Sequence, residues 1–202
     1  MKYEVFLSAP QSAVPGGLYF CGLKPYGAPG RTYGFPEPLP AGFTTYRDRP
    51  RASPFYARAR EVLRLGLDHT LGATADLSAA LCTNWFFYRA ADTAQLKRFG
   101  LERMDCSTFH RHFLSHLRPR LIFCIGNGAV SSYAGMCQLF GVQTVREERY
   151  LGTAKLKEAR GMLSGGAGAG GQGGEQDTRI IGIPHLSRFA VTAQLTEFVG
   201  ST

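Results

Sequence analysis

The chain of 202 residues lacks the features that mark several large classes of protein. It has no apolar run of the length of about 20 residues that a membrane-spanning helix requires. Its first residues, M-K-Y-E-V-F-L, lack the apolar core and the small-residue cleavage site of a signal peptide. We therefore expect a cytoplasmic protein with no membrane partner.

The sequence also lacks the usual patterns for binding a metal, a phosphate loop or a dinucleotide. Its five cysteines contain no C-x-x-C pair, so we expect reduced cysteines in apolar strands rather than a zinc site or disulfides. The glycine-rich segment at residues 164–174 is not followed by Lys-Ser or Lys-Thr, and G-N-G at 126–128 lacks the third glycine of a dinucleotide site. We expect no cofactor and no metal, and we predict that residues 164–174 form a flexible loop.

Basic residues outnumber acidic ones by 23 to 15, which gives the chain a net charge of +8. A positive surplus of this size is typical of proteins that contact a phosphate backbone. It also serves solubility alone, so composition by itself leaves a nucleic-acid partner open.

Apolar runs alternate with amphipathic patterns along the chain. The runs at residues 18–23, 79–87, 121–125 and 179–183 predict strands, and the patterns at 54–67, 105–117, 129–140 and 189–199 predict helices. Strands that are apolar throughout and alternate with helices indicate a parallel sheet covered on both faces. We expect one domain over residues 1–202, a three-layer α/β/α fold with a short, mostly parallel central sheet.

In such a fold ligands bind beyond the carboxyl ends of the strands. These ends carry, in order, G-L-K-P-Y at 22–26 with Gly34 beyond it, C-T-N-W at 82–85, a G-N-G-A turn at 126–129, and P-H-L-S-R at 184–188. The first resembles the G-x-[D/N]-P-[Y/G] motif of the uracil-DNA glycosylase superfamily. The second lies where that family has a base-recognising asparagine, and the others are similar to its G-x-x-A turn and its final H-P-S-P motif. The resemblance implies a uracil-DNA glycosylase-like fold and a DNA partner rather than RNA, and it leaves the oligomeric state open.

The resemblance also implies roles for individual residues. Asn84 would pair with the edge of a flipped or single-stranded base, and His185 would stabilise the anion that leaves when the N-glycosidic bond breaks. Ser187 and the glycine-rich first motif would grip flanking phosphates, and Arg188 would contact the backbone or insert into the base stack. The remaining expected substrate-binding residues are Gly22 and Pro25 in the first motif, Tyr26 beside the base, and Phe35 as a stacking ring in a chain that has Glu37 at the family's phenylalanine position.

Lys24 departs from the family pattern, which has a water-activating aspartate or asparagine at this position. An ammonium group neither accepts a proton from water nor stabilises an oxocarbenium cation. Two hypotheses follow. Either Lys24 attacks the sugar and forms a Schiff base, or it binds a phosphate or pairs with Glu37 in a catalytically silent module that only binds nucleic acid or modified bases. The sequence therefore leaves open whether the chain is an enzyme of DNA base-excision repair.

The three histidines of the predicted helix at 105–117 suggest a metal cluster at first sight. His110 does not share the helix face of His112 and His116, and no carboxylate accompanies them. We expect all three on a solvated basic face with neighbouring arginines, and we expect Phe109 to point inward.

Overall fold

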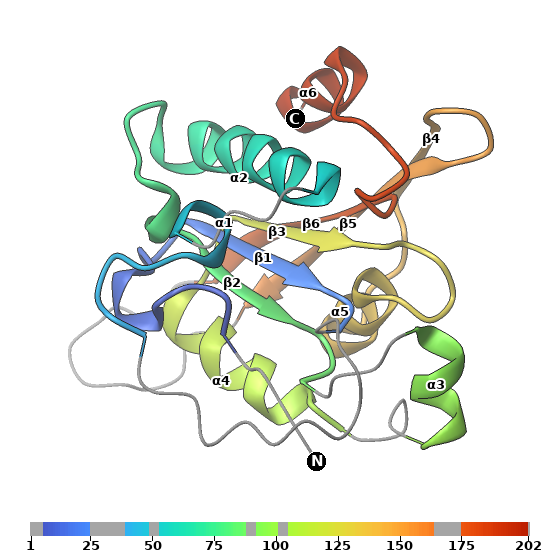
Figure 1. The fold of residues 1–202 in the computed structure, drawn as a ribbon, viewed down its shortest axis with the longest axis horizontal. Helices are drawn as coiled ribbons and strands as arrows, with labels where there is room; N and C mark the ends of the chain where they lie inside the picture. Colours follow the sequence, from blue (N-terminus) through green and yellow to red (C-terminus); the bar gives the residue numbers. More distant parts are fainter. Residues whose placement is uncertain are drawn as a thin grey trace.

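The computed structural model describes residues 6–24, 39–48, 53–87, 92–100, 105–163 and 175–201. The chain forms a six-stranded, mostly parallel sheet with helices on both faces, so the architecture is mixed α/β (Figure 1). The predicted parallel sheet between two helical layers is thereby confirmed. The predicted flexible loop at 164–174 lies outside the described residues.

The strand order is β2-β1-β3-β6-β5-β4. The parallel part consists of β1 (Leu18–Gly22), β2 (Leu81–Asn84), β3 (Leu121–Ile125) and β6 (Gln176–Ile183). β5 (Lys155–Leu163) pairs antiparallel with β6, and β4 (Arg146–Arg149) pairs antiparallel with β5. The last two strands were not predicted, because R-E-E-R in β4 is polar and β5 is only partly buried, as suits the edge of a sheet.

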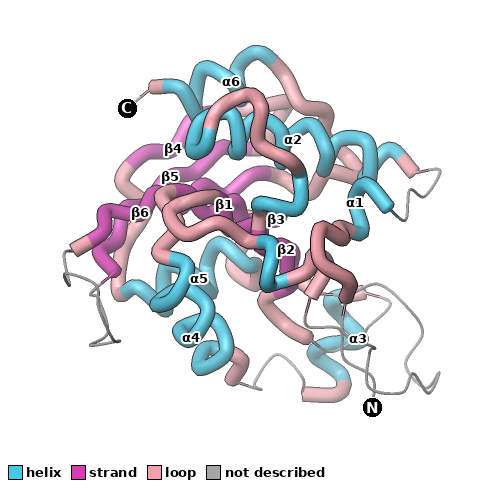
Figure 2. The backbone as a smooth tube through the Cα atoms, turned by 90° about the vertical axis from the view of Figure 1, so that its left-hand side faces the viewer, coloured by secondary structure: helices cyan, strands magenta, loops and turns pink. Residues whose placement is uncertain are grey.

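Two helical layers cover the sheet. The helices are α1 (Thr45–Asp48), α2 (Pro54–Leu71), α3 (Thr93–Arg98), α4 (Ser107–Leu117), α5 (Ser132–Phe140) and α6 (Ala193–Gly200), with short 3₁₀ turns at Pro10–Ser12 and Leu77–Ala79. Figure 2 shows α2 and α6 on one side of the sheet and α4 and α5 on the other. Among the described residues, no helix combines the length and the apolar character that a membrane crossing requires.

Both faces of β1 are buried, which explains why it is apolar at every position. Leu18 and Phe20 pack in the cluster that contains the residues of α2 and α6, whereas Tyr19 and Cys21 pack in the cluster that contains those of α4 and α5. Side chains alternate between the faces of a strand, so a sheet covered on both sides needs an apolar residue at each step. Cys21 is free and buried, as predicted.

Helix α4 corrects two expectations. Phe109 is 54% exposed rather than inward, and His110 is fully buried rather than part of a solvated face. The buried stripe of the helix consists of His110 and Leu114, four residues apart, because residues at that spacing share one face. His112 and His116 are exposed, as predicted.

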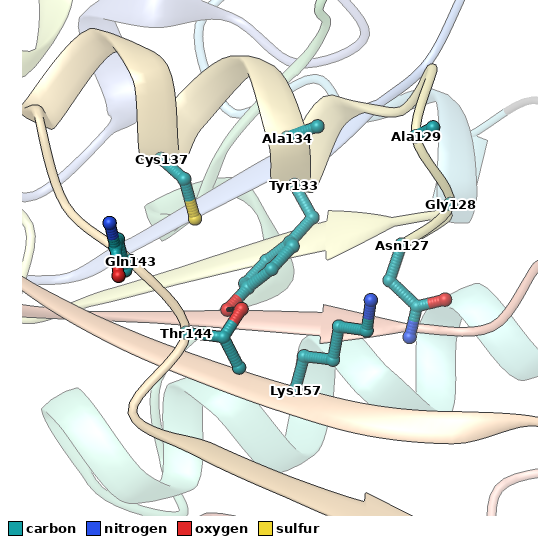
Figure 3. Close-up of a pocket in the computed structure, with 9 residues that line it drawn as sticks. All are labelled: Asn127, Gly128, Ala129, Tyr133, Ala134, Cys137, Gln143, Thr144 and Lys157. Atoms are coloured by element: carbon teal, nitrogen blue, oxygen red, sulfur yellow. Dashed lines mark hydrogen bonds between the residues drawn. The ribbon is translucent and has the colours of Figure 1, made fainter.

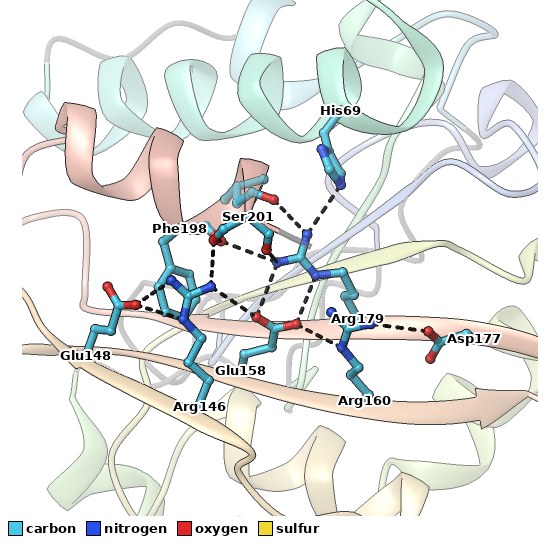
Figure 4. A network of polar contacts seen from close by, with 10 residues as sticks. His69, Arg146, Glu148, Glu158, Arg160, Asp177, Arg179, Phe198 and Ser201 are labelled. Atoms are coloured by element: carbon cyan, nitrogen blue, oxygen red, sulfur yellow. Dashed lines mark hydrogen bonds and ion pairs between the residues drawn. The ribbon is translucent and has the colours of Figure 1, made fainter.

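A buried ionic network fastens the last helix to the sheet (Figure 4). The Arg179 guanidinium donates to both carboxylate oxygens of Glu158, at 3.0 and 3.2 Å, and both side chains are almost fully buried. It also donates to the carbonyl oxygens of Val199 at 2.6 Å and Phe198 at 3.3 Å. These carbonyls end α6 and have no partner within the helix, so one arginine joins β5, β6 and α6.

We predict that Arg179→Ala destabilises the protein by about 3–5 kcal/mol, because it removes the only one of the three arginines near the Glu158 carboxylate that is itself almost fully buried. The control is Arg160→Ala, which removes a 43% exposed partner of the same carboxylate and should cost less than about 1 kcal/mol. Urea unfolding followed by the fluorescence of Trp85, the only tryptophan, measures both. Equal losses for the two variants would contradict this account.

Candidate functional site

The parallel strands end at one edge of the sheet, and the predicted site residues lie there. β1 is flanked by β2, which follows it in the chain, and by β3, so the winding of the chain reverses between β1 and β3. In open α/β sheets a ligand crevice forms at the carboxyl side of such a reversal. Gly22 and Lys24 at the end of β1, Asn84 at the end of β2 and His185 after β6 all belong to this edge.

Asn84 is buried and ends β2 beside Gly22 of β1. The two residues are paired across the ladder, and a Cβ placed on Gly22 would lie 2.5 Å from the Asn84 side-chain oxygen. Gly22 is therefore the residue that gives the amide its room. Asn84 is 5% exposed, yet within the described ranges its Nδ2 has no hydrogen-bond partner.

An unpaired buried donor costs about 1–3 kcal/mol and calls for a physical reason. Asn84 ends β2 at the carboxyl edge, so its Nδ2 lies where a ligand is expected in a fold of this kind.

The chain beyond Asn84 is held by buried contacts. The Trp85 amide donates to the Gly22 carbonyl at 2.7 Å, and the Trp85 carbonyl accepts from His110 Nε2 at 3.0 Å. His110 Nδ1 then accepts from the Tyr19 hydroxyl at 2.8 Å. The Trp85 ring stacks on the His110 ring at 4.6 Å, and a Cβ on Gly135 of α5 would lie 2.3 Å from the Trp85 ring. Trp85 is thus a support for Asn84, packed between α4 and α5.

His185 is oriented by its own loop. The Ser187 amide donates to His185 Nδ1 at 3.3 Å, so the neutral ring carries its proton on Nε2, and the Ser187 hydroxyl lies 2.8 Å from the same nitrogen. His185 is exposed at the surface, but partial desolvation of its ring lowers its pKa, and the positive charges of Arg188 and Lys24 lower it further. The side chain is therefore a neutral imidazole with an N–H to donate.

Two residues of α2 hold the His185 loop. Phe55 stacks on the His185 ring at 5.5 Å, and Arg58 donates to the Leu186 carbonyl at 2.8 Å. Leu186 is 3% exposed and packs in the core, so the leucine that stands in place of the family's proline anchors the loop. Sequence reasoning missed Phe55 and Arg58, because residues about 130 positions apart gave no local signal.

Lys24 lies two residues beyond β1 and is half-buried. Burial lowers the pKa of its ammonium group, and the Asp92 carboxylate acts in the opposite direction. Because the charge of Lys24 also lowers the pKa of His185, these side chains share one electrostatic environment. Pro25, Tyr26 and Phe35, also predicted as site residues, lie outside the described residues.

A cleft of about 480 Å³ lies elsewhere, between α5 and β5 (Figure 3). Asn127, in the turn after β3, borders it and donates to the carbonyls of Lys155 at 2.6 Å and Gly182 at 3.1 Å. The Asn127 amide is thus occupied by backbone, in contrast to Asn84. Of the predicted site residues that the structure describes, none lines this cleft.

Gly22, Lys24, Asn84 and His185, at the carboxyl ends of the strands, form what we call the strand-end cluster. Within the described ranges, no three His, Cys, Asp or Glu side chains are placed to hold an ion. Comparisons of the chain with protein-family models, with curated proteins and with solved structures found no match. Any functional conclusion therefore rests on the chemistry of this edge.

We predict that Gly22→Ala displaces the Asn84 side chain and lowers the stability by about 1–3 kcal/mol, because the new methyl group overlaps the amide. Gly128→Ala, after β3, is the matched control, since a Cβ there meets no heavy atom within 4 Å. It should change the stability by less than about 0.5 kcal/mol. The free energy of unfolding in urea measures both effects. If Gly22→Ala leaves it unchanged, the close contact between position 22 and the Asn84 side chain is contradicted.

A second prediction concerns pH. Burial lowers the pKa of His110 from 6.5 to about 4, so the folded state keeps this ring neutral where the unfolded chain protonates it. The contribution of the neutral His110 ring to the free energy of unfolding is therefore fully present above pH 6.5. It is lost as the pH falls toward about 4, a difference on the order of 3 kcal/mol.

Replacing the ring should remove this part of the pH dependence. We expect His110→Gln to be less stable at pH 7 but to lose less stability between pH 6.5 and pH 4. His112→Gln, exposed on the same helix, should keep the slope of the wild-type protein. Urea unfolding at a series of pH values measures this, and parallel curves for all three proteins would contradict it.

Proposed function

We propose that this chain is a divergent DNA glycosylase of the uracil-DNA glycosylase type, which binds a flipped or single-stranded base at the carboxyl edge of its sheet and cleaves the N-glycosidic bond. The observation that carries the proposal is the buried, unpaired Nδ2 of Asn84. A carboxamide offers a donor and an acceptor side by side, which matches the edge of a nucleobase. Binding a base would satisfy the group that folding leaves without a partner.

The environment of His185 supports the same chemistry. When an N-glycosidic bond breaks, negative charge develops on the leaving base, and a fixed hydrogen-bond donor stabilises it. The Ser187 amide holds Nδ1 as an acceptor and leaves the proton on Nε2. Because its pKa is lowered, the ring is already neutral at pH 7 and donates without first losing a proton.

The positive charges at this edge favour a polyanion. Lys24 and Arg188 both act on His185, and the chain as a whole carries a net charge of +8. Contacts of this kind attract the phosphate backbone, and their strength falls as salt rises. This supports a nucleic-acid strand as substrate over a free base or nucleoside.

Lys24 favours a second candidate function. A lysine beside the sugar cannot activate water as a carboxylate does, so the same edge of the sheet also suits a catalytically silent module that recognises modified or damaged bases. The two functions share Asn84 and differ in whether a base is released.

We expect the purified protein to bind single-stranded oligonucleotides that carry uracil, hypoxanthine or xanthine and to release the free base from one of them. Asn84→Ala should reduce the preference for that strand over one with a tetrahydrofuran abasic analogue by about tenfold to a hundredfold. His185→Ala should lower the rate of base release by about 100-fold to 1,000-fold with little change in binding. Filter binding and chromatography of the released base measure these effects.

His116→Ala, an exposed histidine on α4, is the control and should behave as wild type. Base-selective binding without release would support the silent module. If binding does not distinguish the modified base from the abasic analogue, both candidate functions are contradicted.

A further inference from the structure

Lys24 lies in the strand-end cluster, two residues beyond the end of β1. It follows β1, which has β2 on one side and β3 on the other, so it lies at the reversal of the chain winding. Asn84 ends the neighbouring strand, and the charge of Lys24 reaches His185. If Asn84 binds a base and His185 donates to it, we expect the sugar to lie near the end of β1, where Lys24 follows the Gly22–Asn84 pair.

Partial burial, and not its charged neighbour, favours a nucleophilic amine at Lys24. The side chain is half-buried, which disfavours the ammonium form, while the Asp92 carboxylate ahead of α3 acts in the opposite direction. An amine forms an imine only in its unprotonated form, so partial burial increases the reactive fraction at neutral pH.

We infer that Lys24 gives this site a second activity, strand cleavage at abasic sites through an imine between its Nζ and C1′ of deoxyribose. This inference rests on the proposed function in one respect: base release and strand cleavage would both act on a deoxynucleotide strand. The reaction itself does not require a base, so it can be tested separately.

The steps balance without an added oxidant or reductant. The amine lone pair forms a bond to the C1′ aldehyde carbon of an abasic site, and loss of water from the adduct, together with uptake of one proton from solvent, leaves a protonated imine. The imine draws electrons from C2′, whose proton passes to solvent, and the C3′–O bond breaks with its electron pair on the departing phosphate. Water then hydrolyses the imine, which restores the amine and releases an unsaturated aldehyde on the sugar.

The competing role for Lys24 is simple phosphate binding, and the two make different demands on the side chain. A phosphate contact needs a positive charge, which arginine supplies as well. An imine needs a primary amine, which arginine lacks. Lys24→Arg therefore separates them while the charge beside His185 is kept.

The test uses the full chain and a single-stranded oligonucleotide with a preformed natural abasic site, incubated with sodium cyanoborohydride, which reduces an imine to a stable amine. We expect wild-type protein to yield a covalent adduct that maps to Lys24 by mass spectrometry, and to cut the strand when the reductant is absent. Lys24→Arg should bind the strand with similar affinity and form neither adduct nor product above background. Lys97→Arg, an exposed lysine on α3, should retain both.

Two results would overturn the inference: an undiminished adduct with Lys24→Arg, or no adduct with wild-type protein. Asn84→Ala distinguishes this failure from failure of the proposed function. It should leave trapping on the preformed abasic site intact while abolishing selection of a modified base. A trapped adduct without any base selection would support the strand-cleaving activity and contradict the proposed glycosylase function.

Discussion

Parallel pairing of β1 with both β2 and β3 is the constraint on which the rest of the molecule depends. A strand in this position is covered by helices on both faces, so its side chains are apolar from Leu18 to Cys21. Polar groups are then confined to the points where the strands end. Because the strands run in the same direction, Lys24, Asn84 and His185 gather at one edge although they are far apart in the sequence.

The carboxyl edge of the sheet is held in place by residues that are distant from it in the sequence. His110 from α4 accepts a hydrogen bond from the Tyr19 hydroxyl and donates one to the Trp85 carbonyl, while Arg58 from α2 donates to the Leu186 carbonyl. Sites that hold their reacting groups in place before a ligand arrives lose less freedom on binding. Among the described residues, the Nδ2 of Asn84 has no hydrogen-bond partner, which supports the proposal that it binds a ligand.

The sequence predicted the parts of the fold that arise from continuous apolar runs. β3 has the predicted bounds, and α2 begins at the predicted Pro54. The β4–β5 hairpin was not predicted, because its charged residues resemble those of a loop. The sequence placed Gly22, Asn84 and His185 at strand ends, where the structure has them, and Gly22 lies beside Asn84; that these residues bind a ligand stays a prediction. The residues that support this edge could not be predicted from the sequence. The burial of His110 depends on tertiary packing of α4 against Tyr19 and Trp85, although its spacing of four from Leu114 was a usable hint.

The central claim is that Asn84 reserves its amide for a base, and the chain offers a direct test because it contains only two asparagines. In protein labelled with ¹⁵N-asparagine, each side-chain amide gives a separate NMR signal, and Asn127, already bonded to two carbonyls, serves as an internal reference. On titration with a short deoxyuridine-containing oligonucleotide, we expect the Asn84 amide protons to shift downfield and to exchange more slowly, while those of Asn127 remain unchanged. An Asn84 signal that is unaffected by the bound oligonucleotide would contradict the account.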